Sequence, residues 1–258
     1  MVDLSGKKRV VIKVGTSNIA YKTGNINIRR VESLARIISD IRNSGREVIF
    51  VTSGAISVGM ARMNLSKRPS DTPGKQACAA IGQSELMNIY DTEFTKHNRV
   101  VAQILMTRDV ISNKERRQNA RNTIERLLEM GVIPIINAND TISLENLDFD
   151  ENDTLSALVA KLADADLLIM FTDVDGLYDK NPAEPDAKLI PVVEKITQDM
   201  IHAAGGKGSE LSSGGMLTKL EAAMLAKEDD IPSVIINGER LEILYDLFEN
   251  NAVCTVFV

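Results

Sequence analysis

The chain has 258 residues, a formal net charge of -6 and 44% hydrophobic residues. This length allows one large domain or two small ones with a sizeable core. The acidic balance argues against nucleic acid as a partner. Two cysteines suit a reducing compartment, and no apolar run approaches the ~18 residues of a membrane helix. No signal peptide precedes the first apolar segment. We therefore expect a cytoplasmic α/β protein that binds neither nucleic acid nor membrane.

Strand-like and helix-like segments alternate along the chain. Short β-branched runs predict strands, and apolar residues at helical spacing, with Gly45 and Gly131 as stop signals, predict helices. In chain order we predict strand 10–14, helix 28–42, strand 48–51, helix 76–96, strand 100–105, helix 114–130, strand 132–136, helix 155–165, strand 167–171, helix 216–227, strand 233–236, helix 241–248 and strand 254–258.

Continuous apolar strands separated by amphipathic helices predict a mainly parallel central sheet with helices on both faces. The fold class is therefore a three-layer αβα sandwich. Pro134 argues for a sheet edge or a strand end at its position. No linker or repeat divides the sequence, so we expect one domain, 1–258, with lobes of about 1–165 and 166–258. The glycine-rich stretch 205–215 is predicted to be a mobile loop.

Two lysines beside glycines are the most informative residues for function. Lys13 ends an apolar run just before Gly15, and Lys219 follows Gly214 and Gly215 at the start of a predicted helix. Glycines let backbone N–H groups approach an anion, and a helix N-terminus favours negative charge. Two such sites suggest a clamp around a phosphoryl group in transfer.

Polar segments follow four of the predicted strands, at residues 15–17, 52–55, 137–140 and 172–173. Ligands of parallel α/β sheets bind at the carboxyl ends of strands. The usual nucleotide motifs are missing: the sequence has no G-x-x-x-x-G-K-[ST], no G-x-G-x-x-G after a strand and no protein-kinase signature. A phosphoryl transferase with this sequence must use another architecture.

Seven motifs in order carry a resemblance to a known family. They are VIKVGTS (11–17), VTSGAI (51–56), NARNT (119–123), PIINAND (134–140), ENDTLSA (151–157), TDVDGLY (172–178) and SGGMLTK (213–219). Together they resemble the amino acid kinase family and, within it, the glutamate 5-kinases (γ-glutamyl kinases). A single glycine precedes Thr16, whereas aspartokinases and acetylglutamate kinases carry two at this point.

The resemblance implies an amino acid kinase-like fold and an activity. It implies ATP-dependent phosphorylation of the γ-carboxylate of L-glutamate to γ-glutamyl phosphate, the first step of proline biosynthesis, by direct in-line transfer. Mg²⁺ would arrive with ATP, and no structural metal is expected. The implied partners are a homo-oligomer (dimer or tetramer), proline as feedback inhibitor and the next enzyme, glutamate-5-semialdehyde dehydrogenase. We expect the C-terminal RNA-modification-type (PUA) domain of many relatives to be absent.

The resemblance also assigns residues to the site. Lys13 and Lys219 would flank the phosphoryl group, with Asp153 holding both lysines in place. Ser53, Asp140 and Asn152 would bind glutamate. The nucleotide would meet Lys13, Thr172, Asp173, Ser213, Gly214, Gly215, Met216, Leu217, Thr218 and Lys219.

Other interpretations of these residues stay open at this point. Lys13 could be an edge lysine that reaches solvent, and Lys219 an exposed helix lysine. The acidic run 148–153 could be a solvated loop, or a helix start capped by Asp153, or could bind Mg²⁺ directly. Which groups meet which end of glutamate does not follow from the sequence.

The proposed chemistry needs cations more than it needs a base. The γ-carboxylate of glutamate has a pKa near 4.3, so it is already ionised at neutral pH. A catalytic histidine is therefore not required, and charge stabilisation during phosphoryl transfer falls to preorganised cations. Two alternative functions remain: a sensor that has lost catalysis, and a sister kinase acting on aspartate, acetylglutamate, carbamate or UMP.

Overall fold

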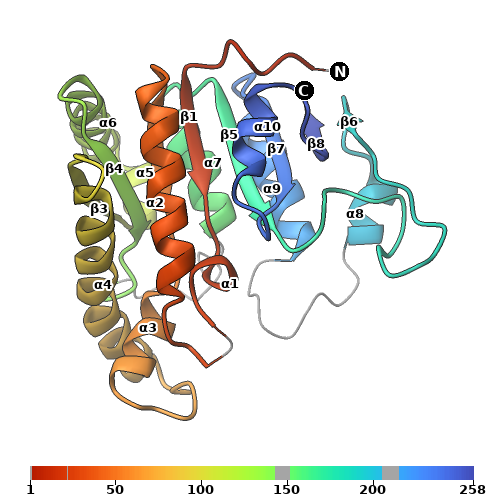
Figure 1. Ribbon diagram of the computed structural model, residues 1–258. Coiled ribbons are helices and arrows are strands. Elements are labelled where there is room, and N and C mark those ends of the chain that lie inside the picture. Colours follow the sequence, from red (N-terminus) through yellow and green to blue (C-terminus); the bar gives the residue numbers. More distant parts are fainter. Residues whose placement is uncertain (1, 22, 143–151, 205–214) are drawn as a thin grey trace.

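The computed structural model describes residues 2–21, 23–142, 152–204 and 215–258. Its centre is an eight-stranded sheet with the order β3-β4-β2-β1-β5-β7-β8-β6 (Figure 1). The strands are β1 (Arg9–Lys13), β2 (Glu47–Val51), β3 (Val101–Met106), β4 (Ile133–Ala138), β5 (Leu167–Thr172), β6 (Val192–Val193), β7 (Ser233–Asn237) and β8 (Cys254–Phe257). The helices are α1 (Thr16–Ile19), α2 (Ile28–Asn43), α3 (Ala55–Arg62), α4 (Thr72–Thr95), α5 (Arg108–Ser112), α6 (Lys114–Glu129), α7 (Asn152–Leu162), α8 (Gln198–Ala204), α9 (Met216–Lys227) and α10 (Ile243–Phe248).

The sheet is mainly parallel, as predicted. Strand β1 lies between β2 and β5 and pairs in parallel with both, so that Lys13 is opposite Val51 on one side and Met170 on the other. Strands β7 and β8 form the antiparallel pair of this sheet, within the part of the chain that the structure describes. The carboxyl ends of β4, β2, β1 and β5 therefore lie side by side at one edge of the sheet.

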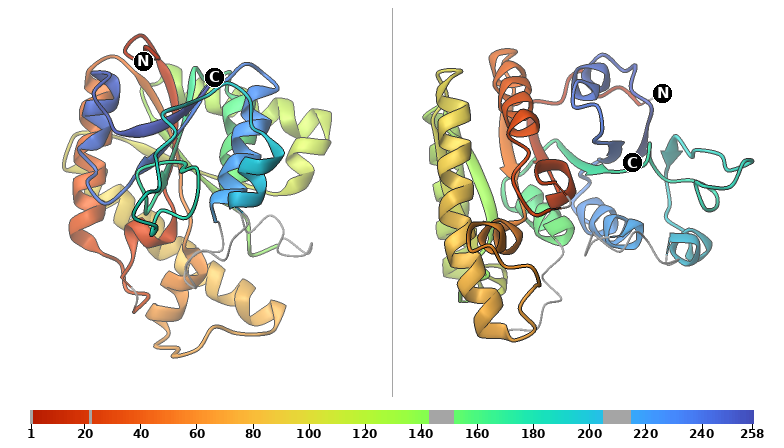
Figure 2. Two further views of the ribbon diagram at one scale, coloured as in Figure 1. Left: turned by 90° about the vertical axis from the view of Figure 1, so that its right-hand side faces the viewer. Right: turned by 60° about the horizontal axis from the view of Figure 1, so that its bottom comes forward.

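Helices cover both faces of the sheet and give the predicted three-layer αβα sandwich (Figure 2). Side chains of α2, α4 and α10 form one buried core with Val10 and Ile12 of β1. Side chains of α6, α7 and α9 form a second core, which contains Val11. Alternate β1 residues thus enter opposite cores, which explains why the centre of this strand, residues 10–12, is continuously apolar.

Helix α3 is seated on α4 through two glycines. A Cβ atom added at Gly82 would lie 1.8 Å from the carbonyl oxygen of Ala55, and one added at Gly59 would lie 1.9 Å from that of Cys78. The helices therefore pack backbone to backbone at these two points, which no larger residue permits without movement. This contact fixes the start of α3, directly after β2.

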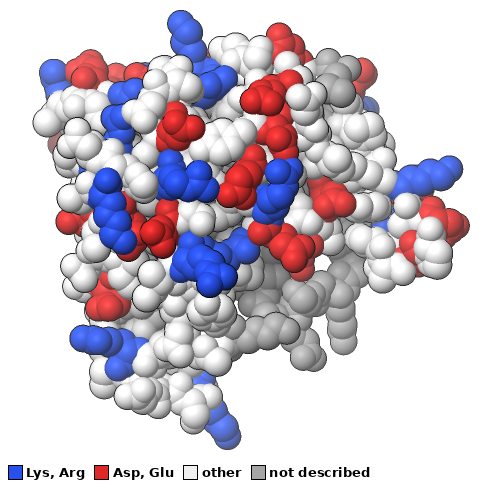
Figure 3. Space-filling model, viewed as in Figure 1, with Lys and Arg blue, Asp and Glu red and all other residues white. Residues whose placement is uncertain are grey.

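Positive and negative side chains are interspersed on the face of the molecule seen in Figure 3. One exposed pair joins two elements of the fold: Arg36 of α2 lies 3.0 Å from Glu242, next to α10. Such mixing of charges is typical of a solvated surface. No helix in the described ranges is long and apolar enough to cross a membrane.

The predicted elements are all found, with ends shifted by a few residues. Pro134 proves to mark a strand end: β4 is an interior strand, but its pairing with β2 begins at Ile135. The predicted edge position is therefore wrong, and the start of β4 accommodates the missing N–H group. The sequence did not predict α1, α3, α5, α8 or β6. Of the predicted mobile loop, residues 205–214 lie outside the described residues.

Candidate active site

The side chains of the candidate site gather at the carboxyl ends of β1, β2 and β4. Thr16 follows β1, Ser53 follows β2, and Asp140 follows β4. Because these strands are parallel neighbours, their ends meet. Helices α7 and α9 approach the same edge with their N-terminal turns, which bring Asp153 and Lys219.

Lys13, Asp153 and Lys219 form a buried cluster. The Nζ atom of Lys13 lies 2.6 Å from Oδ1 of Asp153, and the Nζ atom of Lys219 lies 3.1 Å from Oδ2. The three residues are 6%, 0% and 4% exposed, respectively. Two ammonium groups therefore share one carboxylate, as the sequence predicted. The solvent-exposed interpretations of both lysines are wrong.

The two lysines of this cluster stabilise the ionised form of Asp153. Burial by itself would raise the pKa of Asp153, but the charges of Lys13 and Lys219, with hydrogen bonds from Lys13 and Thr218, hold that pKa below its ordinary value. The Thr218 hydroxyl lies 2.9 Å from Oδ2 of Asp153 and 2.9 Å from the carbonyl oxygen of Gly215. Asp153 is therefore a carboxylate at neutral pH, and it orients both lysines.

The two helix starts supply further positive potential. Asp153 lies in the first turn of α7, where the helix dipole favours a negative charge. Helix α9 begins at Met216, and its N-cap residue Gly215 makes no side-chain capping hydrogen bond. The first N–H groups of a helix lack partners within the helix, so this end of α9 can receive an anion such as phosphate.

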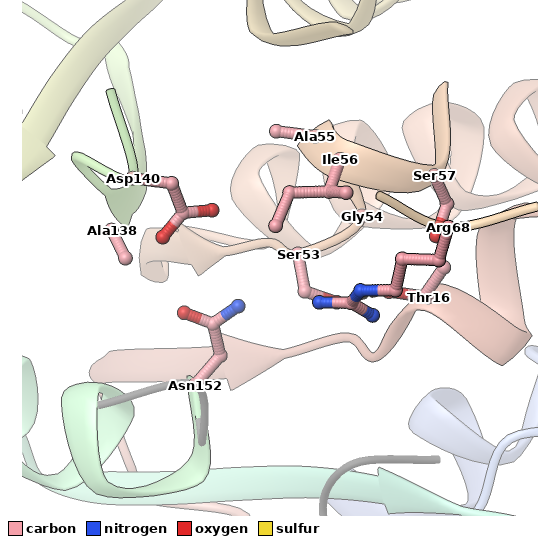
Figure 4. Close-up of a pocket in the computed structure, with 10 residues that line it drawn as sticks. All are labelled: Thr16, Ser53, Gly54, Ala55, Ile56, Ser57, Arg68, Ala138, Asp140 and Asn152. Atoms are coloured by element: carbon pink, nitrogen blue, oxygen red, sulfur yellow. Dashed lines mark hydrogen bonds between the residues drawn. The ribbon is translucent and has the colours of Figure 1, made fainter. Parts of the chain in front are cut away.

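An open pocket with a cavity volume of about 60 Å³ lies beside the cluster (Figure 4). It brings together all three residues predicted to bind glutamate: Ser53, Asp140 and Asn152. Asn152 directly precedes Asp153, so the pocket and the lysine cluster are neighbours. The pocket is also lined by Thr16, Gly54, Ala55, Ile56, Ser57, Arg68 and Ala138.

Glycine is needed where the pocket meets α3. Gly54, the N-cap of this helix, has a left-handed backbone with φ 96°. A Cβ atom there would lie 3.2 Å from the side chain of Thr16. Gly54 thus lets the chain turn from β2 into α3 with the first turn of the helix facing the pocket.

Helix α4 is hydrogen-bonded to the carboxyl ends of β2 and β4. The hydroxyls of Thr52 and Tyr90 are 2.7 Å apart, and the side chain of Asn137 donates a 2.8 Å hydrogen bond to Gln83. Tyr90 is fully buried in the core. Both contacts are buried, so they fix the backbone next to Ser53 and just before Asp140.

One pocket atom has an unmet hydrogen-bonding capacity. Oδ1 of Asn152 is buried and has no hydrogen-bond partner among the described residues. Buried polar groups are almost always paired, so such an acceptor points to a ligand with a donor. Ser53, in contrast, is held by Thr16, whose hydroxyl lies 3.1 Å away, and by the carbonyl of Val14.

The predicted nucleotide residues occupy the other side of the cluster. Thr172 and Asp173 lie at the end of β5, where their side chains are hydrogen-bonded to each other at 3.2 Å. Neither lines the pocket. Gly215, Met216, Leu217, Thr218 and Lys219 form the N-cap and first turn of α9. Ser213 and Gly214, and the acidic run up to residue 151, lie outside the described residues.

Sequence analysis missed Arg68 and Thr16 as pocket residues. Thr16 belongs to the first motif, but nothing in the sequence gave it a role. Arg68 comes from the segment between α3 and α4, far along the chain from any strand end. The signal in the sequence that could have indicated Arg68 is a pair of basic residues before a proline, Lys67-Arg68-Pro69. The described residues contain no group of three or more His, Cys, Asp or Glu placed to hold a metal ion.

Comparison with known proteins agrees with this geometry. The profile described as "Amino acid kinase family" matches residues 8–237. Glutamate 5-kinase of Listeria innocua is 48% identical over 98% of this chain and 94% of its own length. Glutamate 5-kinases of Clostridium perfringens and Enterococcus faecalis are 46% and 45% identical over 99% of this chain, and over 97% and 96% of their own lengths.

Solved structures share the fold at much lower identity. UMP kinase from Ureaplasma parvum superposes with a TM-score of 0.68 at 17% identity, over 97% of this chain and 98% of its own. UMP kinase from Bacillus anthracis gives a TM-score of 0.66 at 18% identity, over 97% of this chain and 96% of its own. With the family profile and the relatives, this common architecture leads to one assignment: the chain belongs to the amino acid kinase family, in the branch of the glutamate 5-kinases.

Proposed function

We propose that the protein transfers the terminal phosphoryl group of ATP to the γ-carboxylate of L-glutamate, the first step of proline biosynthesis. One carboxylate oxygen bonds to the phosphorus as the bond to ADP breaks, giving γ-glutamyl phosphate and ADP. No proton has to be removed from the acceptor. The observation that carries the proposal is the buried Lys13–Asp153–Lys219 cluster beside a pocket lined by Ser53, Asp140 and Asn152, in a chain 48% identical to a glutamate 5-kinase.

In this proposal the two lysines stabilise the charge that spreads over the phosphoryl oxygens. Lys13 and Lys219 are held on one carboxylate, so their ammonium groups are oriented before the substrates bind. Preorganised cations avoid a reorganisation cost in the transition state, and removing one such donor costs on the order of 10²–10³ in rate. Asp153 is a positioning residue that holds the two ammonium groups on its two oxygens.

Glutamate would bind in the pocket with its ammonium group near Asp140 and Asn152. Asp140 offers a carboxylate, and Oδ1 of Asn152 is the buried acceptor that has no partner in the described chain. An ammonium group supplies three donors, which satisfies both. Ser53 and the first N–H groups of α3 are donors suited to a carboxylate.

ATP would approach from the second lobe, from about residue 166 onward, with the amino acid held in the lobe before it. The N-terminal turn of α9 would receive phosphates, and Thr172 and Asp173 would frame the nucleotide. Asp153 already faces two ammonium groups, so it is a poor ligand for a cation. We therefore propose that the phosphates of ATP and water molecules are the ligands of Mg²⁺, as is usual for this ion.

Proline is proposed as a competitive inhibitor at the same pocket. It shares the α-carboxylate and the cationic nitrogen of glutamate but lacks a γ-carboxylate, so it would fill the α-end contacts without offering an acceptor. Rising glutamate should relieve the inhibition. A homo-oligomer also remains part of the proposal, without a contact here that identifies its interface.

The product provides the test, because an acyl phosphate reacts with hydroxylamine to give a hydroxamate. Purified protein, Mg²⁺-ATP and hydroxylamine should give a hydroxamate with glutamate at rates far above those with aspartate, acetylglutamate, carbamate or UMP. Phosphorylation of UMP to UDP would refute the proposal. Release of ADP with glutamate, without formation of any hydroxamate, would refute it as well.

A further inference from the structure

Arg68 is a pocket residue that comes from outside the strand-end motifs. It lies in the segment 63–71, which connects α3 to α4. Its side chain lines the pocket with Ser53 and Asp140, and Figure 4 shows the guanidinium group directed toward Thr16 and Ser53. The segment is exposed, so Arg68 reaches the pocket from its solvent side.

Backbone contacts at both ends hold the segment that carries Arg68. At its start, the N–H groups of Asn64 and Leu65 donate to carbonyl oxygens of α3. At its end, the carboxylate of Asp71 accepts a 2.9 Å hydrogen bond from the N–H of Gly74 and so caps α4. Pro69 also disfavours a helical backbone at Arg68. These restraints reduce the conformational freedom that Arg68 would lose on binding a ligand.

The charges that line the pocket match an amino acid. Among the described lining residues, Arg68 is the cationic side chain and Asp140 the anionic one. In Figure 4 they approach the pocket from different sides. An α-amino acid carries an ammonium group and a carboxylate on one carbon, so it can meet both residues together.

The carboxylate that accepts the phosphoryl group must lie at the end of the site opposite to Arg68. Lys13 and Lys219 are buried on Asp153, the residue directly after Asn152, whereas Arg68 comes from the exposed segment 63–71. The phosphoryl acceptor must reach these lysines. The carboxylate that remains at the solvent side of the pocket is therefore the one on the α-carbon.

From this arrangement we propose that Arg68 binds the α-carboxylate of the amino-acid substrate and makes the pocket selective for it. The inference rests on the proposed function and names a contact within the same site. A guanidinium group presents two parallel N–H donors to a carboxylate, which a lysine cannot imitate. Arg68 thus contributes to substrate binding, while Lys13 and Lys219 act on the group in transfer.

The first experiment compares Arg68→Ala with Lys67→Ala. Lys67 is an exposed cation next in the chain that does not line the pocket, so its variant controls for the loss of charge. Arg68→Ala should raise KM for glutamate about 10- to 100-fold, the range expected for a hydrogen bond to a charged group. Its kcat should stay within about threefold, and KM for ATP should not change. Lys67→Ala should behave as the wild type.

The second experiment identifies the carboxylate. The α-amide of glutamate keeps the γ-carboxylate and the ammonium group but lacks the α-carboxylate. Its affinity, measured by competition against glutamate, should be the same in the wild type and in Arg68→Ala, within about twofold. Millimolar guanidinium should restore glutamate binding to Arg68→Ala, because it can occupy the vacated position. A merely structural role would produce neither result.

Three outcomes would overturn the inference: an unchanged KM for glutamate in Arg68→Ala, an equal loss of affinity for glutamate and its α-amide, or a fall in kcat with KM unchanged. These failures are distinct from a failure of the proposed function. Wild-type protein that forms no hydroxamate with glutamate rejects the function itself, whereas active wild type with an unaffected Arg68→Ala rejects only the role of Arg68.

Discussion

The Nζ atom of Lys13 lies 2.6 Å from Oδ1 of Asp153, and both side chains are almost completely buried. One residue ends the first strand and the other lies in the first turn of α7. A buried charge is tolerated only with a partner, so each of these residues depends on the other. With Lys219 on the second carboxylate oxygen, the cluster links β1, α7 and α9.

We expect the two lysines to be needed for the rate rather than for substrate binding. Lys13→Ala and Lys219→Ala should each lower kcat by roughly two orders of magnitude or more, because each removes a preorganised cation. ADP release at saturating substrates measures this. Lys227→Ala, at the exposed end of the same helix as Lys219, is the matched control and should keep kcat. Near-wild-type kcat in either lysine variant would remove that lysine from the catalytic group.

Asp153→Ala should be strongly destabilising. It leaves two buried ammonium groups facing each other, and breaking a buried ion pair in this way costs about 3–5 kcal/mol. The free energy of unfolding from urea titrations measures the effect. Asp229→Ala breaks the exposed pair with Lys161 and should cost less than about 1 kcal/mol. An equal decrease in the free energy of unfolding in Asp153→Ala and Asp229→Ala would contradict the structural role of Asp153.

The contribution of Asp153 to stability should depend on pH in a defined window. Its pKa is lowered in the folded protein, so folding favours the ionised form. The stabilisation is therefore fully present above the ordinary pKa of about 3.9 and is lost as pH falls through the lower folded value. The difference in unfolding free energy between wild type and Asp153→Asn should be constant from about pH 5 to 8 and shrink below about pH 4. A difference that grows toward acid pH would have the wrong sign.

Asp140→Asn and Asn152→Ala should act mainly on glutamate binding. Both residues line the pocket and lie outside the lysine cluster, so each variant should raise KM for glutamate and leave KM for ATP nearly unchanged. Loss of binding that is equal in the ground and transition states has this kinetic signature. Asp91→Asn, on the exposed side of α4, serves as the control. A selective rise in KM for ATP would place these residues on the wrong side of the site.

Gly82→Ala should weaken both the fold and the pocket. The added methyl group would lie 1.8 Å from the carbonyl oxygen of Ala55, the first residue of α3. Overpacking of this kind costs typically about 1–3 kcal/mol. Because the first turn of α3 lines the pocket, KM for glutamate should rise as well. Ser84→Ala on the exposed side of α4 should change neither quantity, and unchanged stability in Gly82→Ala would mean that the two helices separate freely.

The sequence pattern was sufficient for the strands of the sheet other than β6, which has two residues. The centre of strand β1, residues 10–12, is continuously apolar because its two faces enter different cores, and α9 has the predicted bounds, Met216–Lys227. Helix α3 was missed because it has only eight residues and packs on α4 through glycine as well as through Ala55 and Ile56. Short elements whose packing is backbone to backbone leave no hydrophobic period to detect.

The sequence by itself determined the layered fold and the family, and it singled out two lysines and a carboxylate as candidates, because strand ends, glycines and ordered motifs are local features of the chain. Only the tertiary structure decided that Lys13, Asp153 and Lys219 share one buried cluster, that Asp153 therefore has a lowered pKa, and that Arg68 enters the pocket. The physical reason is that burial, electrostatic coupling and convergence on a pocket depend on distances between segments far apart in the chain, which no local pattern encodes.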